Sequence, residues 1–586
     1  MQIGSHLKNF LLKLFKAIGL ELIIILSFLV LSNNYLGRID VTIKADGVGY
    51  YDYLPSVFIR GDFNRKDFAV SKYPEKYKLL NTRAYFIEYE DRFLDKYPIG
   101  TAILQSPFFL FTKWTTDAVS QEGNPGYQKP FHKAIFHAAI FYLFLSLYFF
   151  KRLLKLYGIK PLSIFFGQIF LVFATSVMHY STADAGFSHI YSLFAITIFL
   201  WKLKSYFNSP SLRQFLVLCL LLGLIILLRQ SNLIVLLVIP FIAGSWERLK
   251  TGVQFLFSSF KPLGFGILII GAILFLQMLS WYFQTGHWVI YSYQGERFYF
   301  DEPHFFEMLF SYRKGLFVYA PILFVSAVSS LYYLFRKDYF SFLTFHLFLF
   351  SFTYVMSSWW TWIFGGSYGN RVYVEYYTFL LIPFLLVINR LKILFQVFVF
   401  TALFPLIYVA VIQTYQYKKF ILHWMDMDEK SYWEVFLHTD KRFEGLLWKE
   451  TPKDNLKVFK TYKLEDIRIE ENRANILSIC QLDKNVFTDS VQFIEIRFSN
   501  SFREDDQTWI DVTIRDTNQN TVFYHNEIPL IRFREQKLNH FHRGKCIMGI
   551  QKGLIQADSE LELSFRSTNK TVLEKPEVIL YLPIPN

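Results

Sequence analysis

Long apolar segments separated by short polar ones fill most of the chain up to about residue 413. The hydrocarbon core of a bilayer is ~30 Å thick, and a helix of ~20 apolar residues crosses it. Each long apolar segment is therefore predicted to form a membrane-spanning helix. The clearest of these segments are residues 17–33, 134–150, 161–178, 185–201, 262–283, 315–335, 339–357, 372–389 and 393–412.

Two further apolar segments decide how many spans the chain has. Residues 215–246 are interrupted only by the polar stretch 229–232, and as one helix they would be ~48 Å long, which is too long for a single span. Basic residues flank this segment on both sides, so it is predicted to form two short spans in a tight hairpin. Residues 99–113 are predicted to form a helix that lies at the outer membrane surface or dips partway into it, because as a span they would place the basic cluster at 151–160 outside. About eleven spans result.

The distribution of charge sets the predicted orientation. The net charge of +13 is compatible with nucleic-acid binding, but the Lys and Arg residues gather at the ends of the apolar segments, which argues against it. About 17 of them fall in segments predicted to be cytoplasmic and about five in short outer loops. We expect a multi-pass bacterial inner-membrane protein with a cytoplasmic N-terminus and an external C-terminus. The first apolar segment lacks a small-residue cleavage site and is interpreted as an anchor.

The soluble parts of the chain are then external. They are the long first outer loop of the membrane domain (1–415), at residues 34–133, and the region that follows this domain. Residues 416–464 are predicted to be a helical or irregular linker. Apolar and polar residues alternate in several runs from 465 to 586, which predicts a periplasmic β-sandwich domain. This domain also holds two cysteines that are candidates for a disulfide, Cys480 and Cys546.

Acids and tyrosines open the first outer loop, a few residues after the first span: Asp46, Tyr50, Tyr51 and Asp52. A carboxylate just outside a membrane helix is suited to act as a general base at the membrane surface. Tyrosines beside it are suited to stack on a sugar. The alternative is an aromatic belt at the membrane surface with solvated acids.

Two other outer turns carry polar residues at a similar depth. His179, Asp184 and His189 are spaced as metal ligands can be, but a short turn in which Asp184 caps a helix fits the pattern better. Arg229 interrupts the long apolar segment, and an arginine in such surroundings needs an anionic partner or water.

The last two outer loops add further charged candidates for substrate binding. Glu296, Arg313 and Lys314 lie in the first of them, and Arg371 and Glu375 lie in the second, after a Gly-rich stretch. Glycine allows a ligand to approach the backbone closely, and arginine can form bidentate hydrogen bonds to a phosphate group. The alternative is an arginine at the membrane surface beside a Trp belt. Acids and arginines on one face of the membrane suit an anionic amphiphile, and no motif of nucleotide hydrolysis or of hydrolases is present.

Four motifs follow one another in order along residues 10–415: ADGVGYYDYL, YPIGTAILQSPFFL, LLLGLIILLRQSN and FGGSYGNR. Together they resemble those of the GT-C superfamily of membrane glycosyltransferases, which includes protein O-mannosyltransferases and lipid A aminoarabinose transferases. This resemblance implies a GT-C-like α-helical membrane fold.

The resemblance implies an enzyme that moves a sugar from a polyprenyl-phosphate donor to an acceptor outside the cytoplasm, with inversion at the anomeric carbon. Asp46 aligns with the leading acid of the family and would be the general base, although Gly47 stands where the family usually has a second acid. Asp52 is the alternative base, or would orient the acceptor or help to hold a divalent cation. Arg371, with Arg229 as second candidate, would stabilise the departing lipid phosphate.

The implied partners are the bilayer, the polyprenyl-phosphate sugar and a lipid, glycan or protein acceptor. The sequence does not identify the sugar, the acceptor or a cofactor. The alternative from another functional class is a lipid or oligosaccharide transporter, or an accessory subunit of a polysaccharide assembly complex. A transporter is expected to carry polar residues at the midplane of several spans, whereas here they gather at the outer ends.

Overall fold

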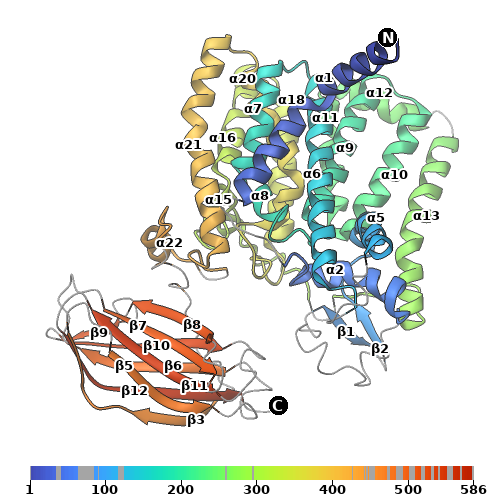
Figure 1. Ribbon diagram of the computed structural model, residues 1–586. Helices are drawn as coiled ribbons and strands as arrows, with labels where there is room; N and C mark the ends of the chain where they lie inside the picture. Colours follow the sequence, from blue (N-terminus) through green and yellow to red (C-terminus); the bar gives the residue numbers. More distant parts are fainter. Residues whose placement is uncertain are drawn as a thin grey trace. The chain divides into compact units, whose positions relative to one another are not determined.

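The computed structural model of the protein has two compact units (Figure 1). The helical unit comprises residues 1–418 and 424–437, and the sheet unit comprises residues 419–423 and 438–586. The structure describes residues 2–33, 41–63, 85–89, 92–116, 125–257, 260–293, 296–424, 427–440, 443, 447, 456–470, 475–482, 492–500, 508–516, 522–529, 534–538, 541–550, 559–567 and 571–583.

The helical unit is mostly α-helix, with two 3₁₀ segments, a π turn and a small hairpin. Its elements up to residue 245 are α1 (Gln2–Leu31), α2 (Asp46–Pro55), η2 (Ser56–Arg60), β1 (Phe86–Tyr89), β2 (Arg92–Asp95), α5 (Gly100–Thr115), α6 (Lys129–Leu156), α7 (Pro161–Phe173), α8 (Val177–Tyr180), α9 (His189–Asn208), α10 (Leu212–Leu228), η5 (Gln230–Val238) and α11 (Ile239–Ala243). Those that follow are α12 (Trp246–Phe257), α13 (Phe260–Thr285), α14 (Phe305–Phe310), α15 (Leu316–Tyr319), α16 (Pro321–Ser329), α17 (Tyr332–Phe335), α18 (Tyr339–Ser357), η6 (Arg371–Tyr376), α19 (Tyr377–Leu380), α20 (Ile382–Ile388), α21 (Ile393–Lys418) and α22 (Glu429–Val435).

Several of these helices are candidates to cross a membrane. In the described chain, five are long and apolar enough: Lys129–Leu156, Phe260–Thr285, Tyr339–Ser357, Arg371–Ile388 and Ile393–Lys418. Shorter apolar helices of 10–17 residues are Ala17–Leu31, Pro161–Phe173, Leu212–Leu228, Gln230–Ala243 and Pro321–Phe335. The structure is thus that of a helical membrane protein with a C-terminal sheet region, but it does not reproduce the expected count of eleven spans.

Backbone breaks explain part of this difference. The expected span 161–178 ends as a helix at Phe173 and continues only as the four-residue α8. The expected span 315–335 divides before Pro321, which begins α16. Proline lacks an N–H and clashes with the preceding turn, so it starts a helix more readily than it continues one. Apolar composition alone does not reveal such breaks.

The long segment 215–246 forms the hairpin that its polar interruption predicts. α10 ends at Leu228, Arg229 is extended (φ −156°, ψ 123°), and η5 and α11 follow. Lys204, near the end of α9, donates to the carbonyl of Ile242 at 3.1 Å. Because α10 begins only four residues after α9 ends, the chain has returned by Ile242 to the level from which α10 started.

The segment 99–113 forms α5, as expected, and α5 lies against the ends of other helices (Figure 1). Gly100 packs on the backbone of Leu227 and Leu228, where a Cβ would lie 2.4 Å from the Leu227 carbonyl oxygen. Tyr142 of α6 donates to the carbonyl of Leu104 at 3.0 Å. The location of this helix at the membrane surface stays a prediction.

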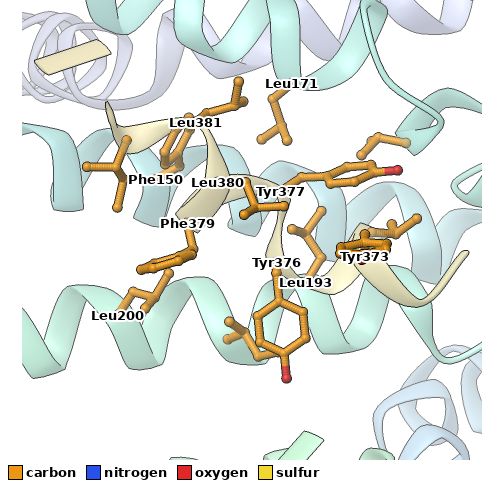
Figure 2. Packing of buried hydrophobic residues seen from close by; sticks show 14 of the residues in the cluster. Phe150, Leu171, Leu193, Leu200, Tyr373, Tyr376, Tyr377, Phe379, Leu380 and Leu381 are labelled. Carbon is orange, nitrogen blue, oxygen red and sulfur yellow. The ribbon is translucent and has the colours of Figure 1, made fainter. Parts of the chain in front are cut away.

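The core of the helical unit is rich in aromatic side chains, which gather around the chain from η6 to α20. Figure 2 shows Tyr376 and Tyr377, neighbours in sequence, pointing in different directions into this core. Their hydroxyls bond to Asn232 at 3.4 Å and to Ser176 at 2.9 Å. Burial of a polar atom costs little free energy when the atom keeps a hydrogen bond. The polar side chains of this segment are therefore compatible with a packed interior.

The helical unit has two ends of different character. One, the loop end, contains residues 42–47, 179–189, 229–232 and 358–371. The other, the basic end, contains residues 151–160, 204–213, 244–250, 336–341 and 389–392 and is rich in Lys and Arg.

The first and last long helices run between these two ends. Thr42 and Ile43, which follow α1, bond through their N–H groups to His132 near the start of α6, while Lys151 near the end of α6 bonds to Ala17 and Glu21. α1 is therefore antiparallel to α6 and leads to the loop end. Lys314 joins the carbonyls of Ser367 and Trp424, so the chain also leaves α21 at the loop end. An odd number of crossings agrees with this path; which end faces the cytoplasm stays a prediction.

The sheet unit contains two antiparallel sheets. Its strands are β3 (Leu456–Lys463), β4 (Ile467–Ile469), β5 (Asn475–Leu482), β6 (Gln492–Asn500), β7 (Thr508–Asp516), β8 (Val522–Pro529), β9 (Arg534–Leu538), β10 (Phe541–Ile550), β11 (Ser559–Ser567) and β12 (Thr571–Pro583). One sheet has the order β3-β12-β6-β10-β9, with β4 also on β12, and the other has the order β5-β11-β7-β8.

Alternating apolar residues of both sheets share one core. Ile494 and Ile496 of β6 belong to the same buried cluster as Ile510, Val512 and Ile514 of β7. This is the packing of a β-sandwich. The first strand begins at Leu456, nine residues before the expected boundary at 465. It lies at the edge of its sheet, and its lysine-rich pattern LKVFKTYK is typical of an edge strand.

The two cysteines of this unit occupy different sheets. Cys480 is on β5 and Cys546 is on β10. Their side chains lie outside the part of the chain that the structure describes, so their disulfide stays a prediction.

Candidate functional site

A cavity of about 600 Å³ opens at the loop end of the helical unit. It brings together segments that lie far apart in the sequence. It is lined by Asp46, Tyr50, Lys96, Tyr97, Pro98, His189, Arg229, Gln230, Ser231, Tyr291, Tyr293, Glu296, Phe298, Met356, Trp359, Trp360, Thr361, Phe364, Gly365 and Arg371.

An ion pair between the first residues of two elements stands in this cavity. Asp46 begins α2 and Arg371 begins η6, and Arg371 Nη2 lies 2.6 Å from Asp46 Oδ2. The side chains keep 23% and 13% of their exposure, so both remain accessible from the cavity. The two residues expected to act as base and as phosphate ligand are therefore direct neighbours.

The segment that carries Asp46 is fixed from two sides. The backbone N–H groups of Thr42 and Ile43 donate to His132 Nδ1 at 3.2 and 3.1 Å. Lys44 pairs with Asp184 at 3.2 Å. These contacts hold Ala45 in an unusual conformation (φ 46°), which turns the chain directly into α2.

Asp184 thus acts on the site through the backbone and does not line the cavity. Its second oxygen bonds to His179 Nε2 at 2.8 Å. Burial would raise the pKa of Asp184, but the Lys44 ammonium and the His179 imidazole together hold that pKa below its ordinary value. The carboxylate is therefore ionised at neutral pH and able to anchor Lys44.

A second charged cluster lies beside the Asp46–Arg371 pair. Glu375, almost fully buried, accepts from Arg229 at 2.8 Å and bonds to His189 at 3.1 Å. Arg229 and His189 line the cavity, and Glu375 lies behind them. The anionic partner that an arginine in apolar surroundings requires is thus Glu375.

Aromatic rings and a third ion pair complete the walls. Lys96 pairs with Glu296 and also lies 4.9 Å from the ring centre of Tyr293. The rings of Tyr50 and Tyr97 are 4.5 Å apart between centres. Burial, and then the Asp46 carboxylate, raise the pKa of Tyr97, so its hydroxyl keeps its proton.

The structure brings together half of the expected site residues. Asp46, Tyr50, His189, Arg229, Glu296 and Arg371 line the cavity. Those that do not are Tyr51, Asp52, Asp184, Arg313, Lys314 and Glu375.

Asp52 has a buried position of its own. It is fully buried, pairs with Arg60 at 2.9 Å and accepts from the hydroxyl of Tyr127 at 2.6 Å. Tyr51 beside it bonds to the carbonyl of Gly126. Both residues pack α2 against its surroundings and face away from the cavity.

Lys96, Tyr97, Tyr293 and Trp359 line the cavity and were not singled out as site residues from the sequence. A signal was present for two of them: Tyr97 begins the YPIG motif, and Trp359 begins the stretch WWTW. Nothing in the sequence indicated that these segments face Asp46.

The three candidate metal ligands of residues 179–189 do not converge. His179 bonds to Asp184, whereas His189 bonds to Glu375. Among the described residues, no group of three His, Cys, Asp or Glu side chains is placed to hold a metal ion. The turn therefore serves to orient residues 42–47 and Glu375.

Comparison with known protein families and with curated proteins finds no match to this chain. Among solved structures, the chain is similar to the crystal structure of the oligosaccharyltransferase of Archaeoglobus fulgidus in the apo form, with a TM-score of 0.39 and 10% sequence identity over 74% of this chain. The chain spans 62% of the length of that protein. The function of this chain is therefore argued from the geometry of its own cavity.

Proposed function

We propose that this protein is a membrane glycosyltransferase that moves a sugar from a polyprenyl-phosphate donor to an acceptor at the non-cytoplasmic surface. The observation that carries the proposal is the ion pair of Asp46 and Arg371 in an aromatic cavity at one end of a bundle of apolar helices. A carboxylate, a guanidinium and flat apolar walls are the groups that transfer from a sugar phosphate needs. The GT-C-like motifs of the sequence support the same function.

The charge of the cavity fits an anionic donor. Its lining holds three cationic residues, Lys96, Arg229 and Arg371, and two acidic ones, Asp46 and Glu296. Lys96 and Arg229 are largely neutralised by Glu296 and Glu375. Arg371 is the best placed for the phosphate, because its Nε is buried without a hydrogen-bond partner among the described residues. A planar guanidinium whose Nε–H is still available as a donor is suited to bind a phosphate oxygen.

Asp46 is the proposed general base. The acceptor hydroxyl oxygen bonds to the anomeric carbon, the bond from that carbon to the phosphate oxygen breaks, and the hydroxyl proton passes to the Asp46 carboxylate. The products are the glycoside, the polyprenyl phosphate and a proton that Asp46 later releases. Attack from the face opposite the phosphate inverts the anomeric carbon.

The ion pair also suggests how the site is primed. In the free protein Arg371 holds Asp46 at 2.6 Å. A donor phosphate competes for the guanidinium and so leaves the carboxylate free to accept a proton. The carboxylate is thus released from Arg371 only when the donor is bound.

The aromatic walls have a matching role. Tyr50, Tyr97 and Tyr293 line the cavity that holds the ion pair, and so do Trp359 and Trp360. Aromatic faces stack on the apolar face of a sugar ring and are also stable at a membrane surface. We propose that they bind the sugar beside the phosphate site.

A transfer assay tests the proposal. Purified protein is incubated with each of a panel of radiolabelled polyprenyl-phosphate sugars and a membrane lipid extract that supplies acceptors. Transfer of label from one donor, lost in Arg371→Ala and retained in Asp301→Asn, an exposed residue outside the cavity, is the expected result. Label transfer that is equal in wild type and Arg371→Ala would show that the cavity is not the site.

A further inference from the structure

A second cavity lies at the basic end of the helical unit. Its volume is about 190 Å³, room for a few groups the size of a water molecule, each ~30 Å³. It is lined by Tyr157, Lys204, Phe241, Gly244, Arg248, Tyr332, Tyr333, Asp338, Ser341, Leu386, Val387 and Arg390. The cavity is remote from the candidate active site, because Lys204 stands 15 residues along α9 from His189, a distance of ~22 Å at 1.5 Å per residue.

The charged residues of this cavity are mostly cationic. Three of its four charged residues are basic, Lys204, Arg248 and Arg390, and the fourth is Asp338. Asp338 is already engaged, because its carboxylate accepts from the backbone N–H of Ser341 at 3.0 Å at the start of α18. Neither arginine has an ion pair with another described residue. Like charges gathered in a half-enclosed space repel one another unless an anion joins them.

Lys204 is held in place by groups that leave its charge uncompensated. Its side chain is buried, its ammonium donates to the carbonyl of Ile242 at 3.1 Å, and it lies 4.4 Å from the ring centre of Tyr157. A carbonyl and an aromatic face orient an ammonium but do not neutralise it. The cavity therefore presents a fixed positive charge.

Two buried phenol groups point to the same kind of ligand. The hydroxyls of Tyr157 and Tyr333 are buried and have no hydrogen-bond partner in the described chain, and Tyr333 as a whole keeps only 8% of its exposure. A buried hydroxyl without a partner costs free energy, so each such group in a native protein requires an explanation. A ligand with several acceptor oxygens would satisfy both donors.

We infer that this cavity is a binding site for a phosphate group, separate from the candidate active site and on the opposite end of the helical unit. A phosphomonoester carries up to two negative charges, which matches the excess of two cationic residues. Its oxygens accept from both guanidinium groups, from Lys204 and from the two phenols. The phosphate belongs either to the head group of an anionic lipid or to a soluble molecule.

Binding of two probes to the full-length protein tests this site. Inorganic phosphate is titrated into the protein in uncharged detergent by calorimetry. Retention of dioleoyl phosphatidic acid, against dioleoyl phosphatidylcholine, is measured by native mass spectrometry. Binding of inorganic phosphate identifies a soluble source, and selective retention of phosphatidic acid without binding of inorganic phosphate identifies a lipid; both outcomes support the site.

The double variant Arg248→Gln with Arg390→Gln is expected to weaken the binding that is found by about tenfold or more, because two charge-assisted contacts are lost. Arg213→Gln, an exposed arginine at the same end but outside the cavity, is expected to leave it unchanged. Tyr157→Phe with Tyr333→Phe removes only two hydroxyls and should weaken binding without lowering the melting temperature. Absence of binding of either probe to the wild type, or equal binding by the double arginine variant, would overturn the inference. Neither result depends on glycosyl transfer.

Discussion

Asp46 and Tyr50 face the cavity while Asp52 and Tyr51 face away from it, and helix geometry explains the division. Residues four apart share one face of an α-helix, whereas positions five and six residues after Asp46 lie on other faces. All four residues were candidates for the site from the sequence, in which residues 34–133 were predicted to be a loop. Since α2 begins at Asp46 itself, only the structure separates the cavity face from the packing face.

The ion pairs of the site were only partly predictable from the sequence. Arg229 in an apolar segment indicated a nearby acid, and the structure supplies Glu375 at 2.8 Å. The partner of Arg371 did not follow from the sequence, because Asp46 lies more than 300 positions away. Pairing over such a separation depends on the packing of the whole unit.

Substitution of Arg371 by lysine tests the proposed phosphate contact. Lysine keeps the positive charge but cannot form the bidentate hydrogen bonds of a planar guanidinium. Turnover with the sugar donor should therefore fall by about 10²-fold, as when one strong hydrogen bond to an oxyanion is lost. Initial rates of sugar transfer measure this, and the melting temperature controls for folding. A lysine variant as active as the wild type would rule out a bidentate contact between Arg371 and the donor phosphate.

Among the elements, α5 shows how a segment of uncertain role is fixed by close packing. The sequence predicted a helix over 99–113, and the structure has it at Gly100–Thr115. Its contact with the end of α10 requires a residue without a side chain, because a Cβ on Gly100 would overlap the backbone of Leu227. No pattern of apolar residues reveals such a contact.

Gly100→Ala should therefore destabilise the helical unit. Overpacking against backbone atoms costs typically ~1–3 kcal/mol, and a lower melting temperature in detergent would report it. Gly271→Ala on α13, where a Cβ meets nothing within 4 Å, is the matched control and should be neutral or slightly stabilising. Equal melting temperatures for the two variants would mean that α5 does not pack on α10 in this way.

For the whole molecule, the sequence predicted the helical region and the C-terminal sheet region, but not the number of spans. Period-two alternation predicted the strands of the sheet region, because successive side chains of a half-buried strand face the core and the solvent in turn. Apolar segments of the membrane part were correctly identified as helical, but breaks such as the one before Pro321 divide several of them. Hydropathy reports the environment of a segment and not the continuity of its helix.

The path of the chain also makes a prediction about orientation. α1 leads to the loop end and α21 ends there, so the chain should leave its last long helix on the side of the membrane that holds the candidate active site. With the basic end in the cytoplasm, alkaline phosphatase fused after Asn586 should be active. A fusion that is active only with a cytoplasmic reporter would reverse the orientation of both ends.

The most direct test of the proposed enzyme is the turnover of Asp46→Asn. General base catalysis is typically worth ~10²–10⁴-fold, so sugar transfer from the preferred polyprenyl-phosphate donor should fall by at least ~10²-fold while donor affinity changes little. Asp52→Asn, in the buried pair with Arg60, should lower thermal stability more than it lowers turnover of the folded protein. Near-normal turnover in Asp46→Asn, measured on protein with an unchanged melting temperature, would contradict the assignment of the base and of the cavity as the active site.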